Sequence, residues 1–153
     1  MANKSKDPSQ TKAVRPPQHQ DRQPGIESEM KPHPVFENPD FKGSSRLSGR
    51  TAFITGGDSG IGRAVALAFA REGADIAIAY LDEDSDAKDT AALVTQKGRE
   101  CLLLKVDISD KSACEQAIAA CVRKFGKLDI LVNNAAEQHP TSSIAETAGV
   151  GVW

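Results

Sequence analysis

Most of the information about the fold lies in a glycine-rich segment, Thr55-Gly56-Gly57-Asp58-Ser59-Gly60-Ile61-Gly62. It follows a short apolar run, Ala52-Phe53-Ile54, and leads into residues 60–72, whose apolar side chains recur at helical spacing. In this setting Gly56 permits a tight turn, Gly60 lets a pyrophosphate approach the backbone, and Gly62 lets the helix pack closely on a sheet. The helix N-terminus supplies N–H groups and a partial positive charge for such an anion. The segment predicts a phosphate-binding turn, and the alternative is a glycine turn without a ligand.

A nucleoside triphosphatase is disfavoured by the residues that follow this turn. Gly57 and Gly62 have the spacing of a P-loop, but Arg63-Ala64 stand where that loop needs Lys and then Ser or Thr.

Strands and helices alternate on the C-terminal side of the turn. Gly73, Gly98 and Gly126 are placed to end the three helices, and Asp110 is placed to cap the third. This alternation predicts an α/β fold with a parallel sheet covered on both faces. With the glycine-rich turn after the first strand, it is typical of a Rossmann-type doubly wound sheet, here its N-terminal half only, for which strand order 3-2-1-4 is expected. Beyond the first strand and helix, the predicted strands are 75–80, 101–106 and 128–132, and the predicted helices are 84–97 and 110–125.

Composition and charge exclude several classes of function. Lys plus Arg number 19 and Asp plus Glu 21, so the net charge of −2 favours neither nucleic acid nor an anionic membrane as partner. No apolar run reaches the ~20 residues of a membrane-spanning helix. Three cysteines without close pairing indicate a reducing, cytoplasmic location. Cys114 and Cys121 are seven residues apart on one predicted helix with no second pair of ligands, so no metal site is expected and both are predicted to pack as small hydrophobes.

The N-terminal part differs in composition from the rest. Seven of the eight prolines lie in the first 39 residues, and residues 1–45 contain few large apolar side chains. We predict a flexible, Pro-rich arm there, disordered by itself, then a dinucleotide-binding half-domain over 46–144 and a separate tail over 145–153. The arm is either a solvated tail or a segment that docks on its own domain or on a neighbouring subunit.

Three motifs resemble those of the short-chain dehydrogenase/reductase family. Residues 55–62 match its Thr-Gly-x-x-x-Gly-x-Gly motif, and Asn133-Asn134-Ala135-Ala136 resembles its Asn-Asn-Ala-Gly motif with Ala in the last place. Val106-Asp107-Ile108 matches the place where the family sets an Asp against the adenine ring. The cofactor-binding residues that the resemblance implies are Thr55, Gly56, Asp58, Ser59, Gly60, Ile61, Gly62, Tyr80, Leu81, Asp107, Ile108, Asn134, Ala135 and Ala136.

Other segments resemble the glucose and ribitol dehydrogenase-like subgroup of that family. They are Gln23-Pro24-Gly25-Ile26-Glu27 with Met30-Lys31-Pro32, residues 43–47, and Glu137-Gln138-His139-Pro140. The resemblance implies an NAD(P)-dependent oxidoreductase that acts on CH–OH groups of a sugar, polyol, alcohol or aldehyde, with a homotetrameric full-length form and a small-molecule substrate.

The choice of dinucleotide depends on the end of the second strand. Tyr80 and Leu81 are followed by Asp82, Glu83 and Asp84, and no basic residue directly follows Tyr80. A 2′-phosphate would meet carboxylates there, so NAD is favoured over NADP. The alternative role of these acids is to complement the dipole of the following helix.

The catalytic residues of the family have no counterpart in this chain. The family uses a Tyr-x-x-x-Lys pair with an upstream Ser, whereas the one tyrosine here, Tyr80, has Asp84 four residues later. His139 has no partner in a recognisable triad, so no catalytic residue is assigned. We expect a truncated or frame-shifted gene model that is inactive by itself. The alternative is a non-catalytic dinucleotide-binding or subunit-interaction module.

Overall fold

The computed structural model describes residues 29–136. The chain divides into two units, residues 1–34 and residues 35–153, and the sheet and its helices lie in the second. Most of the predicted arm, His139 and the predicted tail lie outside the described residues.

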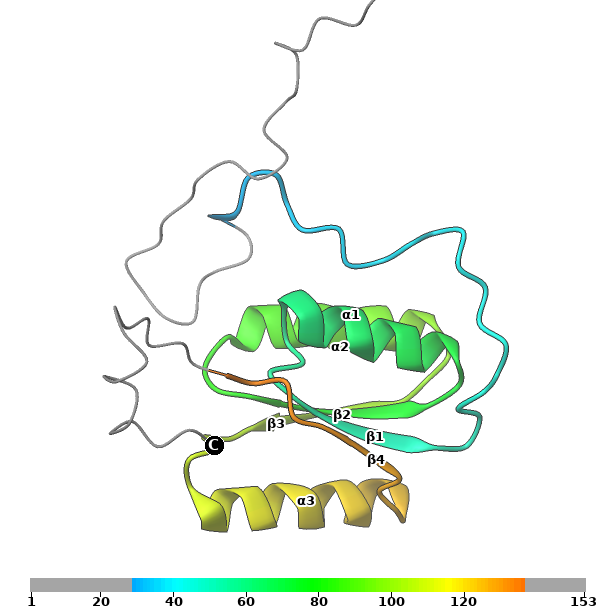
Figure 1. Ribbon diagram of the computed structural model, residues 1–153. Helices are drawn as coiled ribbons and strands as arrows, with labels where there is room; N and C mark the ends of the chain where they lie inside the picture. The colour runs from blue at the N-terminus through cyan, green and yellow to red at the C-terminus, as the bar shows by residue number, and fades with distance from the viewer. Residues whose placement is uncertain (1–28, 137–153) are drawn as a thin grey trace, which may run out of the picture. The chain divides into compact units, whose positions relative to one another are not determined.

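Four parallel strands form the sheet, in the order β3-β2-β1-β4. They are β1 (Thr51–Thr55), β2 (Asp75–Tyr80), β3 (Cys101–Lys105) and β4 (Ile130–Val132). In Figure 1, the helices α1 (Gly60–Arg71) and α2 (Asp84–Gln96) cover one face of the sheet, and α3 (Lys111–Phe125) covers the other. The predicted half of a Rossmann-type fold and its strand order are confirmed.

The strand β4 begins later than predicted, after Asp129, whose backbone N–H donates to the Thr51 carbonyl at 3.0 Å while its side chain takes the Thr51 N–H. Its carboxylate accepts a hydrogen bond from the Thr51 N–H at 2.9 Å and one from Arg50 at 2.7 Å. The Asp129 side chain therefore accepts the hydrogen bond from the Thr51 N–H that a backbone carbonyl of a longer β4 would accept.

The predicted signals at the ends of α3 are confirmed. The Asp110 carboxylate accepts hydrogen bonds from Ser112 N–H at 2.8 Å and Ala113 N–H at 3.3 Å. At the other end Gly126 is in the left-handed conformation, with φ of 78°, and its N–H donates to the Val122 carbonyl.

Two apolar clusters hold the layers together. Between α1, α2 and the sheet, the side chains of Ile54, Leu67, Ile76, Ile78 and Val94 are fully buried. The cluster under α3 contains Phe53, Ala77, Ala79, Val106, Ala117 and Cys121. Cys121 is completely buried and packs as a small hydrophobe, as predicted.

Glu72, just after α1, is one of the residues that attach the segment preceding β1 to the end of that helix. Glu72 accepts hydrogen bonds from the backbone N–H groups of Ser44 and Arg46, and its other oxygen lies 2.7 Å from the Arg46 guanidinium. The Arg46 hydrogen bonds lower the pKa of Glu72 to about 2. The part of the predicted arm that directly precedes β1 is therefore docked on its own domain.

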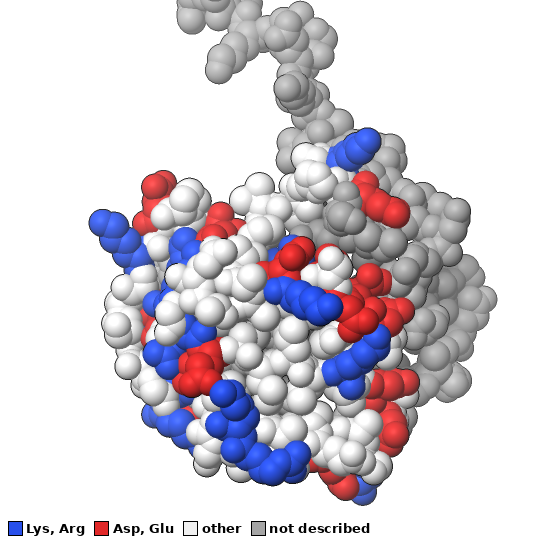
Figure 2. Space-filling model, turned by 180° about the vertical axis from the view of Figure 1, so that it is seen from behind, with Lys and Arg blue, Asp and Glu red and all other residues white. Residues whose placement is uncertain are grey.

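The outer surface carries both signs of charge. Figure 2 shows Lys and Arg interspersed with Asp and Glu over the visible face. Within residues 29–136, every helix is too short or too polar to cross a membrane.

Candidate functional site

The glycine-rich segment forms the connection from β1 to α1. The Gly56 N–H donates to the Ala79 carbonyl at 2.7 Å, which ties the start of the turn to β2. A Cβ atom on Gly62 would collide with the Gly56 carbonyl oxygen and lie 2.7 Å from the Asn134 amide nitrogen. Only glycine lets α1 begin this close to the sheet, and the packing predicted for Gly62 is confirmed.

Gly60 lies on the open side of the turn. Its φ is 52°, a left-handed conformation that favours glycine, and apart from its chain neighbours and the nearby backbone of α1, no atom lies within 4 Å of the place where a Cβ would be. The N-cap Ser59 makes no capping hydrogen bond with its side chain, and the first turn of α1 contains no acidic residue. The partial positive charge of the helix N-terminus is therefore not neutralised by an acidic side chain in that first turn.

A buried arginine holds the centre of the turn from the helix side. The Arg63 side chain donates to the Asp58 carbonyl from Nε at 3.1 Å and from Nη2 at 2.8 Å. Thr90 on α2 donates to the same carbonyl at 2.7 Å and accepts from Arg63 Nε at 2.8 Å. Arg63 and Thr90 were not predicted as site residues. The sequence signal for Arg63 is a cation directly after Gly62, at the position where a P-loop would have Lys.

The end of β4 is joined to the turn through Asn134. Its side-chain amide donates to the Thr55 carbonyl at 3.0 Å and to the Gly56 carbonyl at 2.9 Å. The backbone N–H groups of Asn134 and Ala135 both donate to the Thr55 hydroxyl oxygen, at 2.9 and 3.0 Å. The glycine-rich motif and the Asn-Asn motif therefore meet although Thr55 and Asn134 are 79 residues apart, and the Asn134 side chain holds the start of the turn in place.

The ends of β2 and β3 are linked by Asp84. Its carboxylate accepts a hydrogen bond from the Tyr80 hydroxyl at 2.8 Å and lies 3.0 Å from the Lys105 ammonium group. Burial and the bond to Asp84 raise the pKa of Tyr80, while the bonds from Lys105 and Tyr80 lower the pKa of Asp84. Tyr80 is thus held as a neutral phenol.

Apolar side chains are exposed around this same edge of the sheet. Ile61, Leu81 and Ile108 follow β1, β2 and β3 and are 76%, 51% and 45% exposed. Close to them, the Asp107 carboxylate accepts a hydrogen bond from the Ser109 N–H at 2.9 Å, which lowers the pKa of Asp107. Because the strands are parallel, their carboxyl ends meet at one edge, and the structure brings all the predicted site segments there.

The direction in which successive strands are added to the sheet reverses at β1. The strands β2 and β3 lie on one side of β1, and β4 lies on the other side. In open parallel sheets, ligands bind at the carboxyl ends of the strands beside such a switch point. The glycine turn, Asp107 and Asn134 all lie at this end. Among residues 29–136, no group of three or more His, Cys, Asp or Glu side chains is arranged to hold a metal ion.

The fold and this turn define a nucleotide-binding domain of Rossmann type. A family model described as short chain dehydrogenase matches residues 50–149, and the chain belongs to that family. It is 62% identical over 128 residues to an uncharacterized oxidoreductase of Bacillus subtilis, YhdF, covering 84% of this chain and 44% of that protein. It is 42% identical over 133 residues to glucose and ribitol dehydrogenase homolog 2 of Arabidopsis thaliana, covering 83% of this chain and 46% of that protein. The chain thus spans less than half the length of these relatives, and the expected resemblance to the glucose and ribitol dehydrogenase subgroup is confirmed.

Solved structures of the family contain either dinucleotide. A short chain dehydrogenase from Burkholderia cenocepacia in complex with NADP is 39% identical, with a TM-score of 0.61, over 63% of this chain and 40% of that one. Carveol dehydrogenase from Mycobacterium avium in complex with NAD is 31% identical, with a TM-score of 0.61, over 66% of this chain and 40% of that one.

Proposed function

We propose that this chain binds the adenosine and pyrophosphate portions of NAD and forms the cofactor-binding half of an oxidoreductase. The observation that carries the proposal is the turn itself, where Gly60 faces open space while Gly62 packs against Gly56. A pyrophosphate needs backbone N–H groups that it can approach without meeting a Cβ atom.

The residues around the turn fit such a dinucleotide. Thr55, Gly56, Asp58, Ser59, Gly60, Ile61 and Gly62 would form the pyrophosphate cradle. The exposed apolar side chains of Leu81 and Ile108 would contact the adenine, and the ionised Asp107 carboxylate can accept from its exocyclic amine. Tyr80 would lie by the adenosine ribose, and Asn134, Ala135 and Ala136 toward the nicotinamide ribose. Bound NAD would supply or accept the hydride.

NAD is proposed rather than NADP because of the charges at the end of β2. Lys105, a cation at that edge, is already paired with Asp84, and Asp82 and Glu83 precede Asp84. A 2′-phosphate would therefore add two negative charges among carboxylates. We expect the dissociation constant for NADP⁺ to exceed that for NAD⁺.

The reaction proposed for the whole protein is oxidation or reduction at a CH–OH carbon of a sugar, polyol, alcohol or aldehyde. The support is the name of the Arabidopsis relative, glucose and ribitol dehydrogenase homolog 2, together with the subgroup's motifs in this sequence. From the same resemblance we propose a small-molecule substrate and a homotetramer, and from the three cysteines without close pairing we propose a cytoplasmic location. No described residue is assigned a catalytic role.

Calorimetric titration of the 153-residue chain with NAD⁺ tests the site through two matched variants. Gly60→Ala places a methyl group where the pyrophosphate would lie, and Gly98→Ala places one at the end of α2. Both glycines have left-handed φ, 52° and 74°, and open space beside them, so both variants carry a similar strain of about 1–2 kcal/mol. We expect similar losses in thermal stability but a rise of about tenfold or more in the dissociation constant for Gly60→Ala alone. Equal affinities in the two variants, or no binding of NAD⁺ to the unaltered chain at millimolar concentration, would overturn the proposal.

A further inference from the structure

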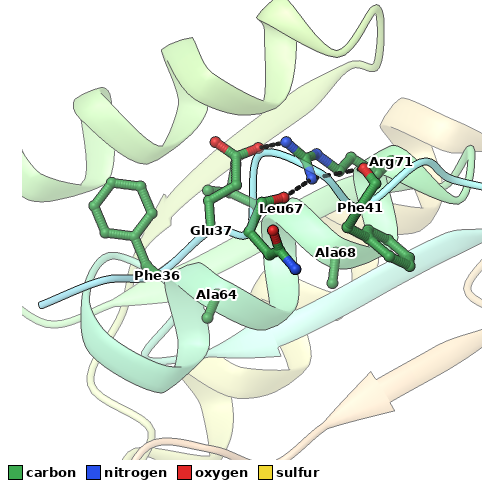
Figure 3. Close-up of a pocket in the computed structure, with 8 residues that line it drawn as sticks. Phe36, Glu37, Phe41, Ala64, Leu67, Ala68 and Arg71 are labelled. Atoms are coloured by element: carbon green, nitrogen blue, oxygen red, sulfur yellow. Dashed lines mark hydrogen bonds and ion pairs between the residues drawn. The ribbon is translucent and has the colours of Figure 1, made fainter. Parts of the chain in front are cut away.

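The N-terminal segment of the described unit follows α1 along its outer side. Figure 3 shows Phe36 beside Ala64 near the start of the helix and Phe41 beside Arg71 near its end. Glu37 fastens this segment, because its carboxylate lies 2.6 Å from the Arg71 guanidinium and 2.7 Å from the Lys97 ammonium group. Arg71 also donates to the Phe41 carbonyl at 2.9 Å.

Two phenylalanines of this segment each lie over an arginine of α1. The Phe36 ring centroid is 5.3 Å from the Arg63 guanidinium carbon, and the Phe41 centroid is 6.0 Å from that of Arg71. The two arginines differ in what else they bind. Arg71 binds the segment itself, whereas Arg63 is 6% exposed and holds the Asp58 carbonyl of the glycine turn.

We propose that Phe36 is a positioning residue for the glycine-rich turn and acts through Arg63. The Phe36 ring contacts the Arg63 guanidinium, attracts this cation and shields it from water. Hydrogen bonds from Arg63 to the Asp58 carbonyl are stronger when water is excluded from them. The N-terminal segment thereby stabilises the turn through Arg63.

The orientation of the Ser59 N–H follows from the geometry of the peptide bond. The Asp58 carbonyl and the Ser59 N–H belong to one planar unit, and in a trans peptide they point in opposite directions. Arg63 and Thr90 together supply three hydrogen bonds to the Asp58 oxygen, at 2.7 to 3.1 Å. They therefore aim the Ser59 N–H away from α2, toward the open side of the turn.

This inference rests on the proposed dinucleotide site for its functional consequence. A turn with a fixed orientation pays less conformational entropy when an anion binds. Docking of the segment at Phe36 should then raise the affinity for the dinucleotide. A change that releases the segment should lower this affinity.

The test compares Phe36→Ala with Phe41→Ala in the full chain. Each variant removes one ring from one arginine of α1. Phe36 also packs on the apolar cluster under α1 and α2, whereas Phe41 is 38% exposed, so Phe36→Ala should lower the thermal midpoint more, and the comparison depends on exchange in the turn and on the dissociation constant. Hydrogen–deuterium exchange without ligand is measured on peptides that contain residues 57–63, and the dissociation constant for NAD⁺ is measured by calorimetry. For Phe36→Ala we expect exchange in that peptide to rise about tenfold and the dissociation constant to rise about fivefold. For Phe41→Ala we expect both values to stay within about twofold of the unaltered chain.

Two further variants separate the aromatic character of Phe36 from its size. Phe36→Tyr keeps the aromatic face and should restore both values, whereas Phe36→Leu keeps an apolar side chain and should restore neither completely. Equal effects of Phe36→Ala and Phe41→Ala on the turn, or no effect of either, would overturn the inference. If the unaltered chain does not bind NAD⁺, the proposed function fails, and the exchange measurement still decides the role of Phe36.

Discussion

Replacement of Asn134 by alanine should destabilise the domain by separating β4 from the glycine turn. The variant loses two hydrogen bonds from the side-chain amide, 3.0 Å to the Thr55 carbonyl and 2.9 Å to the Gly56 carbonyl. Each such bond contributes about 1 kcal/mol net, so the expected loss is about 2 kcal/mol of unfolding free energy. In a domain of about 100 residues, 1 kcal/mol moves the melting temperature by about 4–8 °C, so we expect a fall of about 8–16 °C.

The neighbouring asparagine provides the matched control for this experiment. Asn133 is exposed, so Asn133→Ala removes the same amide one residue earlier and should change stability by less than about 0.5 kcal/mol. Thermal and urea unfolding followed by circular dichroism measure both variants. Equal stabilities for Asn133→Ala and Asn134→Ala would refute the assignment of Asn134 as the link.

A double-mutant cycle with Thr55→Val checks that the link is a single network. The Thr55 hydroxyl accepts the backbone N–H groups of Asn134 and Ala135, so it holds the same strand end by separate bonds. If the two sets of bonds act together, the double variant should deviate from additivity by at least about 0.5 kcal/mol. Strict additivity would mean that the two contacts act independently.

Two further predictions concern the packing of α1 and the pH dependence of stability. Leu67 is 1% exposed, whereas Ile61 on the same helix is 76% exposed. In urea unfolding, Leu67→Ala should lower the free energy of unfolding by about 2–5 kcal/mol and Ile61→Ala by about 0.5 kcal/mol or less. Similar losses for the two variants would contradict the buried position of Leu67. The Arg46 hydrogen bonds lower the pKa of Glu72 to about 2, so this carboxylate stabilises the fold above its unfolded pKa of 4.5 and loses that effect as the pH falls toward 2. Melting temperatures are measured from pH 7 to pH 2. The Glu72→Gln variant should have a lower melting temperature than the unaltered chain at pH 7, and the difference should shrink toward pH 2. A difference that stays constant with pH would mean that the ionisation of Glu72 is not the cause.

The types and order of the elements could be predicted from the sequence because their signals are local. Apolar runs such as residues 52–54 predict strands, helical spacing over 60–72 predicts α1, and Asp110 and Gly126 mark the ends of α3. The strand order is the one expected of the Rossmann-type half-fold that the glycine turn indicates. Each of these signals depends on residues that are close together in the chain.

The polar contacts that support the site are different, because their partners are far apart in sequence. Arg63 meets Thr90 across 27 residues, and Asn134 meets Thr55 across 79. Tyr80 and Asp84 are only four residues apart, but Lys105, which completes their cluster, lies 21 residues beyond Asp84. No periodicity specifies such partners.

The sequence alone therefore determined that a strand, a glycine turn and a helix follow one another and that a parallel sheet forms around them. Only the tertiary structure decided that Arg63 is buried and holds the Asp58 carbonyl, and that Phe36 lies over its guanidinium. The physical reason is that secondary structure responds to neighbours within a few residues, whereas a buried polar group needs partners that the packing of separate elements brings to it.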